Sequence, residues 1–208
     1  MHLALGLRAK KILNYFGYDL RYHRPFYETV VQPLGIKTIL DIGANDGQAA
    51  TDMRTRFPDA HIYSFEPLAE CFAKLSVLAT YDKKLTPLHY ALGAKNETGV
   101  IQKSSFNPSS SLLTMASLHK VLYPKSAKNT TEQIEIKRLD DVSATLALQA
   151  PILVKIDVQG FEDKVIQGGN DTLAKASVIV VETSFFTLYE GQALFNTIAE
   201  KLSALGFS

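Results

Sequence analysis

The sequence has little of several features that would direct it to particular classes of protein. Its 208 residues contain a single cysteine, Cys71, so no internal disulfide can form. The formal net charge of +1 gives no electrostatic reason to expect nucleic acid as a partner. No apolar run approaches the roughly 18 residues that a membrane span requires. These absences favour a chain with an ordinary hydrophobic core in a reducing, cytoplasmic setting.

The N-terminal segment is predicted to stand apart from the main domain. Its opening, MHLALGLRAKKILNYF, is interrupted by Arg8, Lys10 and Lys11 and has no small-residue cleavage site, which favours an amphipathic helix over a signal peptide. Residues 1–35 are therefore predicted as a helical extension. Residues 36–208 have the length and apolar content of one domain with a substantial core.

Strand-like and helix-like segments alternate along this domain. Continuous apolar runs predict strands over residues 37–42, 61–66, 85–92, 152–158 and 177–182. Helical patterns cover residues 48–57, 68–79 and 191–205, and another helix begins near residue 161. The alternation predicts an α/β fold with a mostly parallel central sheet and helices on both faces. Residues 93–141 interrupt it with two extra strands around the polar segment SSFNPSSSLLT, an insertion that predicts either a solvated loop or a substrate-facing lid.

Acidic residues gather where the predicted strands end. Parallel sheets bind ligands outside the carboxyl ends of their strands, at the point where the strand order reverses. The residues at these ends are Asp41, Glu66, Ala91 with Leu92, Asp157 and Glu182. Four of these five positions carry a carboxylate, so the sequence predicts a ligand site at this edge of the sheet.

The turn GANDG after the first strand indicates which ligand to expect. Gly43 and Gly47 allow positive φ and close approach of a ligand to the backbone, but the three-glycine dinucleotide pattern is incomplete. Asp41 and Asp46 would repel a pyrophosphate, whereas they would attract S-adenosylmethionine, which carries an ammonium and a sulfonium. Glu66 follows about 20 residues later, where an acid can bind ribose hydroxyls. The candidate cofactor-binding residues are Asp41, Gly43, Asn45, Asp46, Gly47, Glu66, Pro67, Ala91 and Leu92.

Three segments together resemble the FkbM family of class I S-adenosylmethionine-dependent methyltransferases. They are ILDIGANDGQ with YSFEP, then RLDD at residues 138–141, then LVKIDVQGFEDKVIQGG with IVVETSF and LYEGQ. The resemblance extends over roughly residues 36–195. It implies a Rossmann-like fold, S-adenosylmethionine as cofactor and methylation of a hydroxyl oxygen, in a family whose members act on sugars, macrolides and other natural products. That fold ends in a β-hairpin, which we expect to be missing because the sequence stops at SALGFS.

Charged residues in ILVKIDV suggest where the acceptor is methylated. Side chains alternate along a strand, so Lys155 and Asp157 are predicted to share a face. Charges on a central strand are costly unless they are paired or functional, so Lys155 either forms a structural ion pair with Glu182 or belongs to the catalytic site. Asp157 is the first candidate for the methyl-transfer site, ahead of Glu162 and Glu182, although Glu162 is also suited to a helix start. Asp157 is the candidate general base, and His89 is a weaker candidate. The candidate catalytic residues are Asp157, Glu162, Glu182 and Lys155. The sequence leaves open whether the three acids bind a metal ion, and we predict no metal ligands.

Three hypotheses follow for the function. The leading one is an S-adenosylmethionine-dependent O-methyltransferase that acts on a small molecule or a sugar, with neither nucleic acid nor membrane as partner. An NAD(P)-dependent oxidoreductase would explain the fold and Glu66, but not the acidic glycine turn. A catalytically silent Rossmann-like binding module is the third. The oligomeric state is not predicted.

Overall fold

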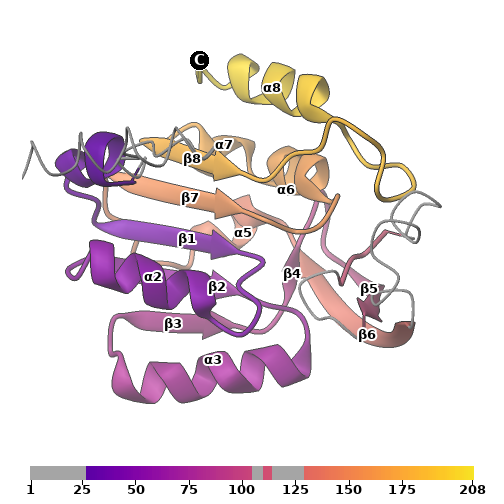
Figure 1. Ribbon diagram of the computed structural model, residues 1–208, viewed down its shortest axis with the longest axis horizontal. Helices are drawn as coiled ribbons and strands as arrows, with labels where there is room; N and C mark the ends of the chain where they lie inside the picture. Colours follow the sequence, from indigo (N-terminus) through magenta and orange to yellow (C-terminus); the bar gives the residue numbers. More distant parts are fainter. Residues whose placement is uncertain (1–26, 105–109, 114–128) are drawn as a thin grey trace, which may run out of the picture.

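The computed structural model describes residues 27–104, 110–113 and 129–208, and the predicted N-terminal helix lies outside these ranges. A central sheet organises the described part of the chain (Figure 1). Its strands are β1 (Thr38–Ile42), β2 (His61–Phe65), β3 (Leu85–Leu88), β7 (Ile152–Ile156) and β8 (Val178–Val181). Their order is β3-β2-β1-β7-β8, and every neighbouring pair is parallel. The predicted α/β fold with a parallel sheet is confirmed.

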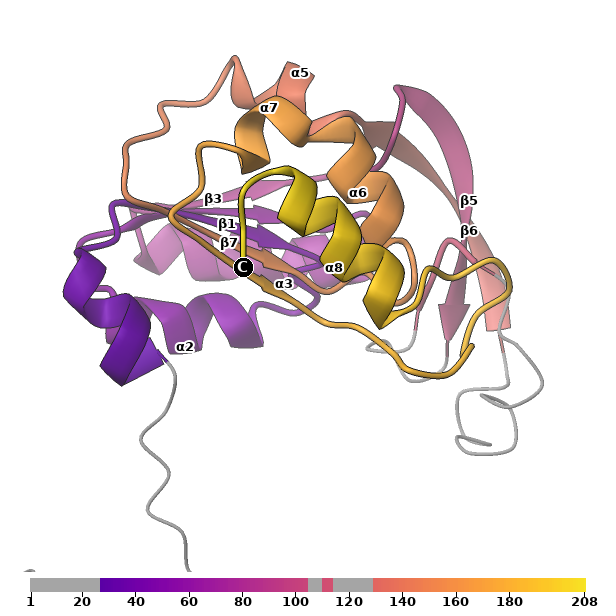
Figure 2. The same ribbon diagram turned by 90° about the horizontal axis from the view of Figure 1, so that it is seen from above.

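Helices cover both faces of the sheet, which Figure 2 shows from above. On one face lie α2 (Gln48–Arg56) and α3 (Ala69–Tyr81), and on the other lie α5 (Leu139–Ser143), α6 (Glu162–Gly168), α7 (Asn170–Leu173) and α8 (Phe195–Ala204). Two short helical turns, Tyr27–Val31 and Gln32–Leu34, precede β1. Within β1, Ile39 packs into a hydrophobic cluster with residues of α2, and Leu40 packs into a second cluster with residues of α6 and α8. Both faces of the strand are buried, which explains the continuous apolar runs in the sequence.

A second, smaller sheet contains the two extra strands that the sequence predicted within residues 93–141. Its order is β4-β6-β5, formed by β4 (Ala91–Leu92), β5 (Glu97–Ser104) and β6 (Asn129–Lys137). The prediction of one strand over residues 85–92 is wrong, because the chain leaves the central sheet after Leu88 and enters the second sheet at Ala91. Pro87 fits this arrangement, since it lacks a backbone N–H and lies in β3, an edge strand. Of the polar segment, residues 105–109 and 114 lie outside the described part.

The strand order places the chemistry at one edge of the sheet. The chain passes from β1 outward to β2 and β3, and from β7 outward to β8 in the opposite direction. The carboxyl ends of β1 and β7 are therefore the point where the strand order reverses, at which ligands bind in such sheets. None of the helices in the described ranges combines the length and the apolar character that crossing a bilayer would demand.

Candidate active site

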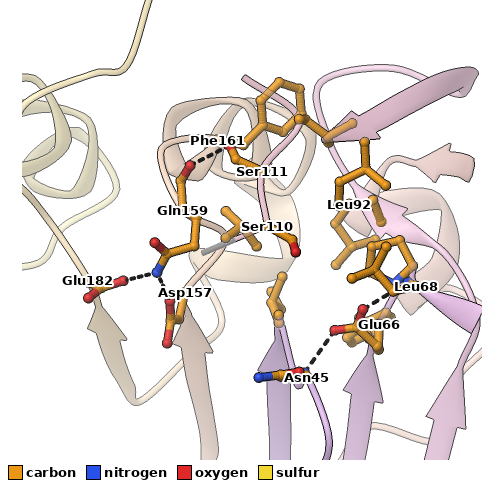
Figure 3. A pocket seen from close by; sticks show the side chains of 18 residues that line it. Asn45, Glu66, Leu68, Leu92, Ser110, Ser111, Asp157, Gln159, Phe161 and Glu182 are labelled. Atoms are coloured by element: carbon orange, nitrogen blue, oxygen red, sulfur yellow. Dashed lines mark hydrogen bonds between the residues drawn. The ribbon is translucent and has the colours of Figure 1, made fainter. Parts of the chain in front are cut away.

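A cavity of about 260 Å³ lies at the carboxyl edge of the central sheet (Figure 3). Many of its lining residues are those that the sequence placed at strand ends: Gly43, Asn45, Glu66, Pro67, Ala91, Leu92, Asp157 and Glu182. The other sequence candidates do not line it: Asp41, Asp46, Gly47, Lys155 and Glu162. The structure thus brings together most of the predicted site but assigns several of its members to other positions.

Glu66 anchors one side of the cavity. Its Oε2 accepts a hydrogen bond from the backbone N–H of Asn45 at 2.8 Å, and its Oε1 accepts one from the backbone N–H of Leu68 at 2.8 Å. Burial raises the pKa of Glu66 to about 7, although these two backbone bonds oppose the shift. Each carboxylate oxygen still has a second lone pair that can accept a hydrogen bond from a ligand. Glu66 therefore fixes the turn after β1 and also offers acceptor atoms to the cavity.

The two glycines of the turn after β1 have different roles. Gly43 has φ +81°, and a Cβ there would overlap the backbone carbonyl of Asp157, so the turn packs directly on the end of β7. Gly47 has φ +87° and packs against the side chains of Leu75 and Leu78 on α3. Gly43 is thus a residue of the cavity wall, whereas Gly47 allows α2 and α3 to pack closely.

A buried row of polar side chains crosses the sheet beneath the cavity. Asp41 is in register with Ser64 on β2 and with Lys155 on β7. The ammonium of Lys155 lies 3.3 Å from Asp41 Oδ1, and Ser64 Oγ donates to Asp41 Oδ2 at 3.2 Å. Burial raises the pKa of Asp41, and the ammonium of Lys155 opposes the shift. Asp41, which the sequence proposed as a cofactor-binding residue, thus has its carboxylate fully buried in this row and does not line the cavity.

Lys155 also differs from its predicted pairing. Besides Asp41, its ammonium lies 3.5 Å from Asp157 Oδ2 and donates to the carbonyl of Gly43 at 3.3 Å. The expected ion pair with Glu182 is replaced by these contacts, because Asp41 lies directly opposite Lys155 on the adjacent strand. Burial lowers the pKa of Lys155, but the two aspartates outweigh it and raise the pKa overall. Lys155 thus contacts both the glycine turn, through the carbonyl of Gly43, and Asp157 from beneath the cavity.

Asp157 and Glu182 form a carboxyl pair on the side of the cavity opposite Glu66 (Figure 3). The hydrogen bond with Asp157 and partial burial raise the pKa of Glu182 to about 7, even though its side chain is solvent-exposed. Burial would raise the pKa of Asp157, but Glu182 and Lys155 hold it below its usual value. Two interacting carboxyls titrate as a unit, so near neutral pH Asp157 is ionised and the pair exchanges one proton, mainly on Glu182.

Glu162 lies behind the cavity wall. It is buried at the start of α6, and its Oε1 accepts from the backbone N–H groups of Val158 and Gly160 at 3.2 and 3.0 Å. These bonds shape the loop between β7 and α6, in line with the helix-start role that the sequence left open. No group of three or more His, Cys, Asp or Glu side chains is arranged to hold a metal ion within the described ranges.

Several cavity residues were missed by the reasoning from sequence. They include Phe65, Leu68, Ile101, Gln159 and Phe161. Ser110, Ser111 and Leu112 also line the cavity, and they belong to the polar segment for which the sequence left open the role of a substrate-facing lid. Gln159 did carry a local signal, since it follows a strand end and precedes Gly160 in a turn. Among the described residues, the non-glycine positions with positive φ are Asn45 (+50°) and Gln159 (+55°), and both line the cavity.

The charges of the cavity all have one sign. Its ionisable lining side chains are the carboxyls of Glu66, Asp157 and Glu182, and no lysine, arginine or histidine is among the described residues that line it. The sequence argument for a cationic ligand rested on Asp41 and Asp46, but neither lines the cavity. The case for a cationic ligand therefore rests on Glu66, Asp157 and Glu182, which do line the cavity. Such a cavity disfavours a pyrophosphate and favours a ligand with cationic groups.

Known proteins resemble this chain along most of its length. Residues 41–208 match a family model described as the methyltransferase FkbM domain. The 2-O-methyltransferase NoeI of Sinorhizobium fredii is 29% identical over 199 residues, which cover 88% of this chain and 77% of NoeI. The hexuronic acid methyltransferase AglP of Haloferax volcanii is 29% identical over 147 residues, covering 68% of this chain and 54% of AglP.

Two further matches are a third methyltransferase sequence and a solved structure. The methyltransferase sdnD of Sordaria araneosa is 29% identical over 153 residues, covering 62% of this chain and 59% of sdnD. The crystal structure of methyltransferase FkbM from Methylobacillus flagellatus superposes with a TM-score of 0.48 at 13% identity, covering 72% of this chain and 33% of that one. The chain thus spans less than two thirds of sdnD, AglP and the solved structure.

Proposed function

The chain belongs to the FkbM methyltransferase family, and from this we propose that it transfers a methyl group from S-adenosylmethionine to a hydroxyl oxygen of a sugar or another small molecule. The observation that carries the proposal is the cavity at the switch point, whose ionisable side chains are all acidic. A cofactor with an ammonium and a sulfonium suits this charge, whereas the pyrophosphate of NAD does not.

The lining residues fit S-adenosylmethionine in three respects. Gly43 lets the turn pack directly on the carbonyl of Asp157, and the backbone of this turn lines the cavity, where it can lie against the cofactor. Glu66 offers its remaining lone pairs to ribose hydroxyls. Leu68, Ala91 and Leu92 supply apolar surface for the adenine ring on the same side as Glu66 (Figure 3). We assign these residues to cofactor binding.

Asp157 and Glu182 are assigned to the acceptor side of the cavity. When bound, the cofactor supplies an activated methyl group on its sulfonium, and loss of this methyl group turns the sulfonium into a neutral thioether. The chain must hold the acceptor oxygen in line with that methyl, and such positioning supplies about 7–11 kcal/mol. Asp157 is ionised, lies on the cavity and can take the hydroxyl proton at its carboxylate. Lys155 stabilises the ionised form of Asp157 from below.

The acceptor is proposed from the activities that the names of the relatives state, together with the cavity. NoeI is named as a 2-O-methyltransferase and AglP as a hexuronic acid methyltransferase. Paired carboxyls such as Asp157 and Glu182 are suited to hydrogen-bonding neighbouring hydroxyls of a sugar ring. A silent binding module would not need a carboxylate held in its ionised form at the cavity.

A calorimetric titration with S-adenosylhomocysteine and, in parallel, with NAD tests the proposed cofactor. We expect S-adenosylhomocysteine to bind and NAD not to bind, because the acidic cavity repels a pyrophosphate. Binding of NAD alone would overturn the proposal. If S-adenosylhomocysteine binds, incubation with tritiated S-adenosylmethionine and a panel of pyranoses and hexuronic acids tests methyl transfer.

Replacing Glu66 by alanine should weaken S-adenosylhomocysteine binding. Charged hydrogen bonds of about 1.5–3 kcal/mol are lost, which corresponds to roughly ten- to 150-fold in affinity. The matched control is Glu132→Ala, because the carboxylate of Glu132 also binds a backbone N–H, that of Ala69 at 2.9 Å, but does not line the cavity. Equal affinities of the two variants in calorimetry would sink the ribose assignment.

Binding of S-adenosylhomocysteine should depend on pH through Glu66. Its pKa of about 7 in the free protein means that much of it is protonated at pH 6. Ribose hydroxyls donate to the carboxylate, so the ligand favours the ionised form, and binding releases a proton and weakens as the pH falls below about 7. Calorimetry at pH 6.5 in two buffers of different ionisation enthalpy measures this proton. Equal proton release in wild type and Glu66→Ala would refute the assignment to Glu66.

A further inference from the structure

Gln159 is bound by segments from three separate parts of the chain (Figure 3). Its Nε2 donates to Asp157 Oδ1 at 3.0 Å and to Glu182 Oε2 at 2.6 Å. Its Oε1 accepts from the hydroxyl of Tyr189 at 2.9 Å, and its backbone carbonyl accepts from Ser111 Oγ at 2.6 Å. Both hydrogens of the amide are therefore used, one on each member of the carboxyl pair.

The contacts determine which way the amide points. The ionised carboxylate of Asp157 only accepts hydrogen bonds, so a rotated amide would place its oxygen against an acceptor. The hydroxyl of Tyr189 donates to the amide oxygen, and its ring is buried with 1% exposure. The orientation of the Gln159 amide is thus fixed from both ends.

The backbone of Gln159 adopts a conformation that is costly for its residue type. Its φ of +55° lies in the left-handed region, which glycine enters without strain and glutamine does not. The contacts of the side chain and of the carbonyl must therefore offset this strain. Strained residues of this kind gather at functional sites, and Gln159 lines the cavity.

Building on the proposed function, we propose that Gln159 is a positioning residue that holds Asp157 and Glu182 side by side at the acceptor end of the cavity, with Tyr189 fixing its amide. The amide binds one oxygen of each carboxyl group, while the other oxygen of Asp157 lies 3.5 Å from the ammonium of Lys155. Without this bridge the two carboxyls would repel each other once both are ionised. Gln159 thereby sets the geometry and the shared proton of the pair that meets the acceptor hydroxyl.

Other charged groups also act on the pair. Lys155 lies 3.5 Å from Asp157 Oδ2 on the same strand and favours its ionised form. Glu162 at the start of α6 and Asp41 on β1 add negative charge. The Gln159 and Tyr189 variants leave the identity of all three residues unchanged, so we expect a change in the titration of the pair to report on the amide bridge.

Carboxyl ¹³C NMR titration of the full chain tests the proposal without any acceptor. Gln159→Glu exchanges the bridging donor for a third carboxyl of the same shape, and we expect the titration midpoint of Glu182 to rise by about 1–2 pH units. Tyr189→Phe should shift it in the same direction by less, because the amide stays but loses its anchor. The signal of Glu182 is assigned by its loss in Glu182→Gln.

Two further variants complete the test. Gln167→Glu makes the same charge change at an exposed position of α6 that does not line the cavity, and it should leave the midpoint unchanged. Gln159→Gly relieves the positive φ, so it keeps the fold even if the glutamate variant does not, and it should still shift the midpoint. A midpoint equal to wild type in Gln159→Gly and Gln159→Glu would overturn the proposal. Wild type that binds no S-adenosylhomocysteine would instead refute the proposed cofactor and leave the titration result valid.

Discussion

Replacing Asp157 by asparagine is expected to slow methyl transfer by about 10²–10⁴-fold, the usual contribution of a general base. The amide keeps the shape of the side chain but cannot take the proton of the acceptor hydroxyl. The rate is measured by transfer of tritium from S-adenosylmethionine to a sugar that the wild type methylates. Affinity for S-adenosylhomocysteine should change little, because Asp157 lies across the cavity from Glu66 (Figure 3).

Asp171→Asn is the matched control for this experiment. Asp171 is exposed on α7 and does not line the cavity, so the same chemical change there should leave the rate unaltered. A wild-type rate in Asp157→Asn would remove Asp157 from the mechanism. Parallel losses of rate and of S-adenosylhomocysteine affinity would place Asp157 among the cofactor contacts instead.

Replacing Gly43 by alanine is expected to lower the free energy of unfolding by roughly 2–6 kcal/mol, the sum of backbone strain and overpacking. Gly43 has φ +81°, and a Cβ there would overlap the backbone carbonyl of Asp157. The strain arises where the glycine turn meets β7, so S-adenosylhomocysteine binding should be lost as well. Urea denaturation and calorimetry measure the two effects.

The Gly191→Ala variant separates backbone strain from overpacking as causes of the expected loss of stability. Gly191 has φ +76°, close to that of Gly43, but a Cβ there would meet no atom within 4 Å. It therefore carries the backbone strain alone, about 1–3 kcal/mol, without the overlap. If the two alanine variants were equally destabilised, the close packing of the glycine turn on β7 would not be what requires glycine at position 43.

The sequence was least informative where distant segments meet. The predicted strand over residues 85–92 reads LTPLHYAL, and its pattern does not show that the chain passes to the second sheet after Leu88. Ser111 is separated from Gln159 by 48 residues, and their 2.6 Å hydrogen bond exists only because β5 and β6 pair beside the cavity. Contacts of this kind follow from packing between elements, which a local pattern does not encode.

The sequence by itself determined the kind of fold and the edge of the sheet at which three of the acids meet. Alternating apolar and helical segments predict a parallel sheet, and the carboxyl ends of parallel strands must lie at one edge, so Glu66, Asp157 and Glu182 could be placed together. Partners across strands could not be assigned, because they depend on strand order and register. With β1 next to β7, Lys155 lies opposite Asp41, and Glu182 is left to pair with Asp157. Tertiary structure alone decided which acids are buried in an ion pair and which face the cavity.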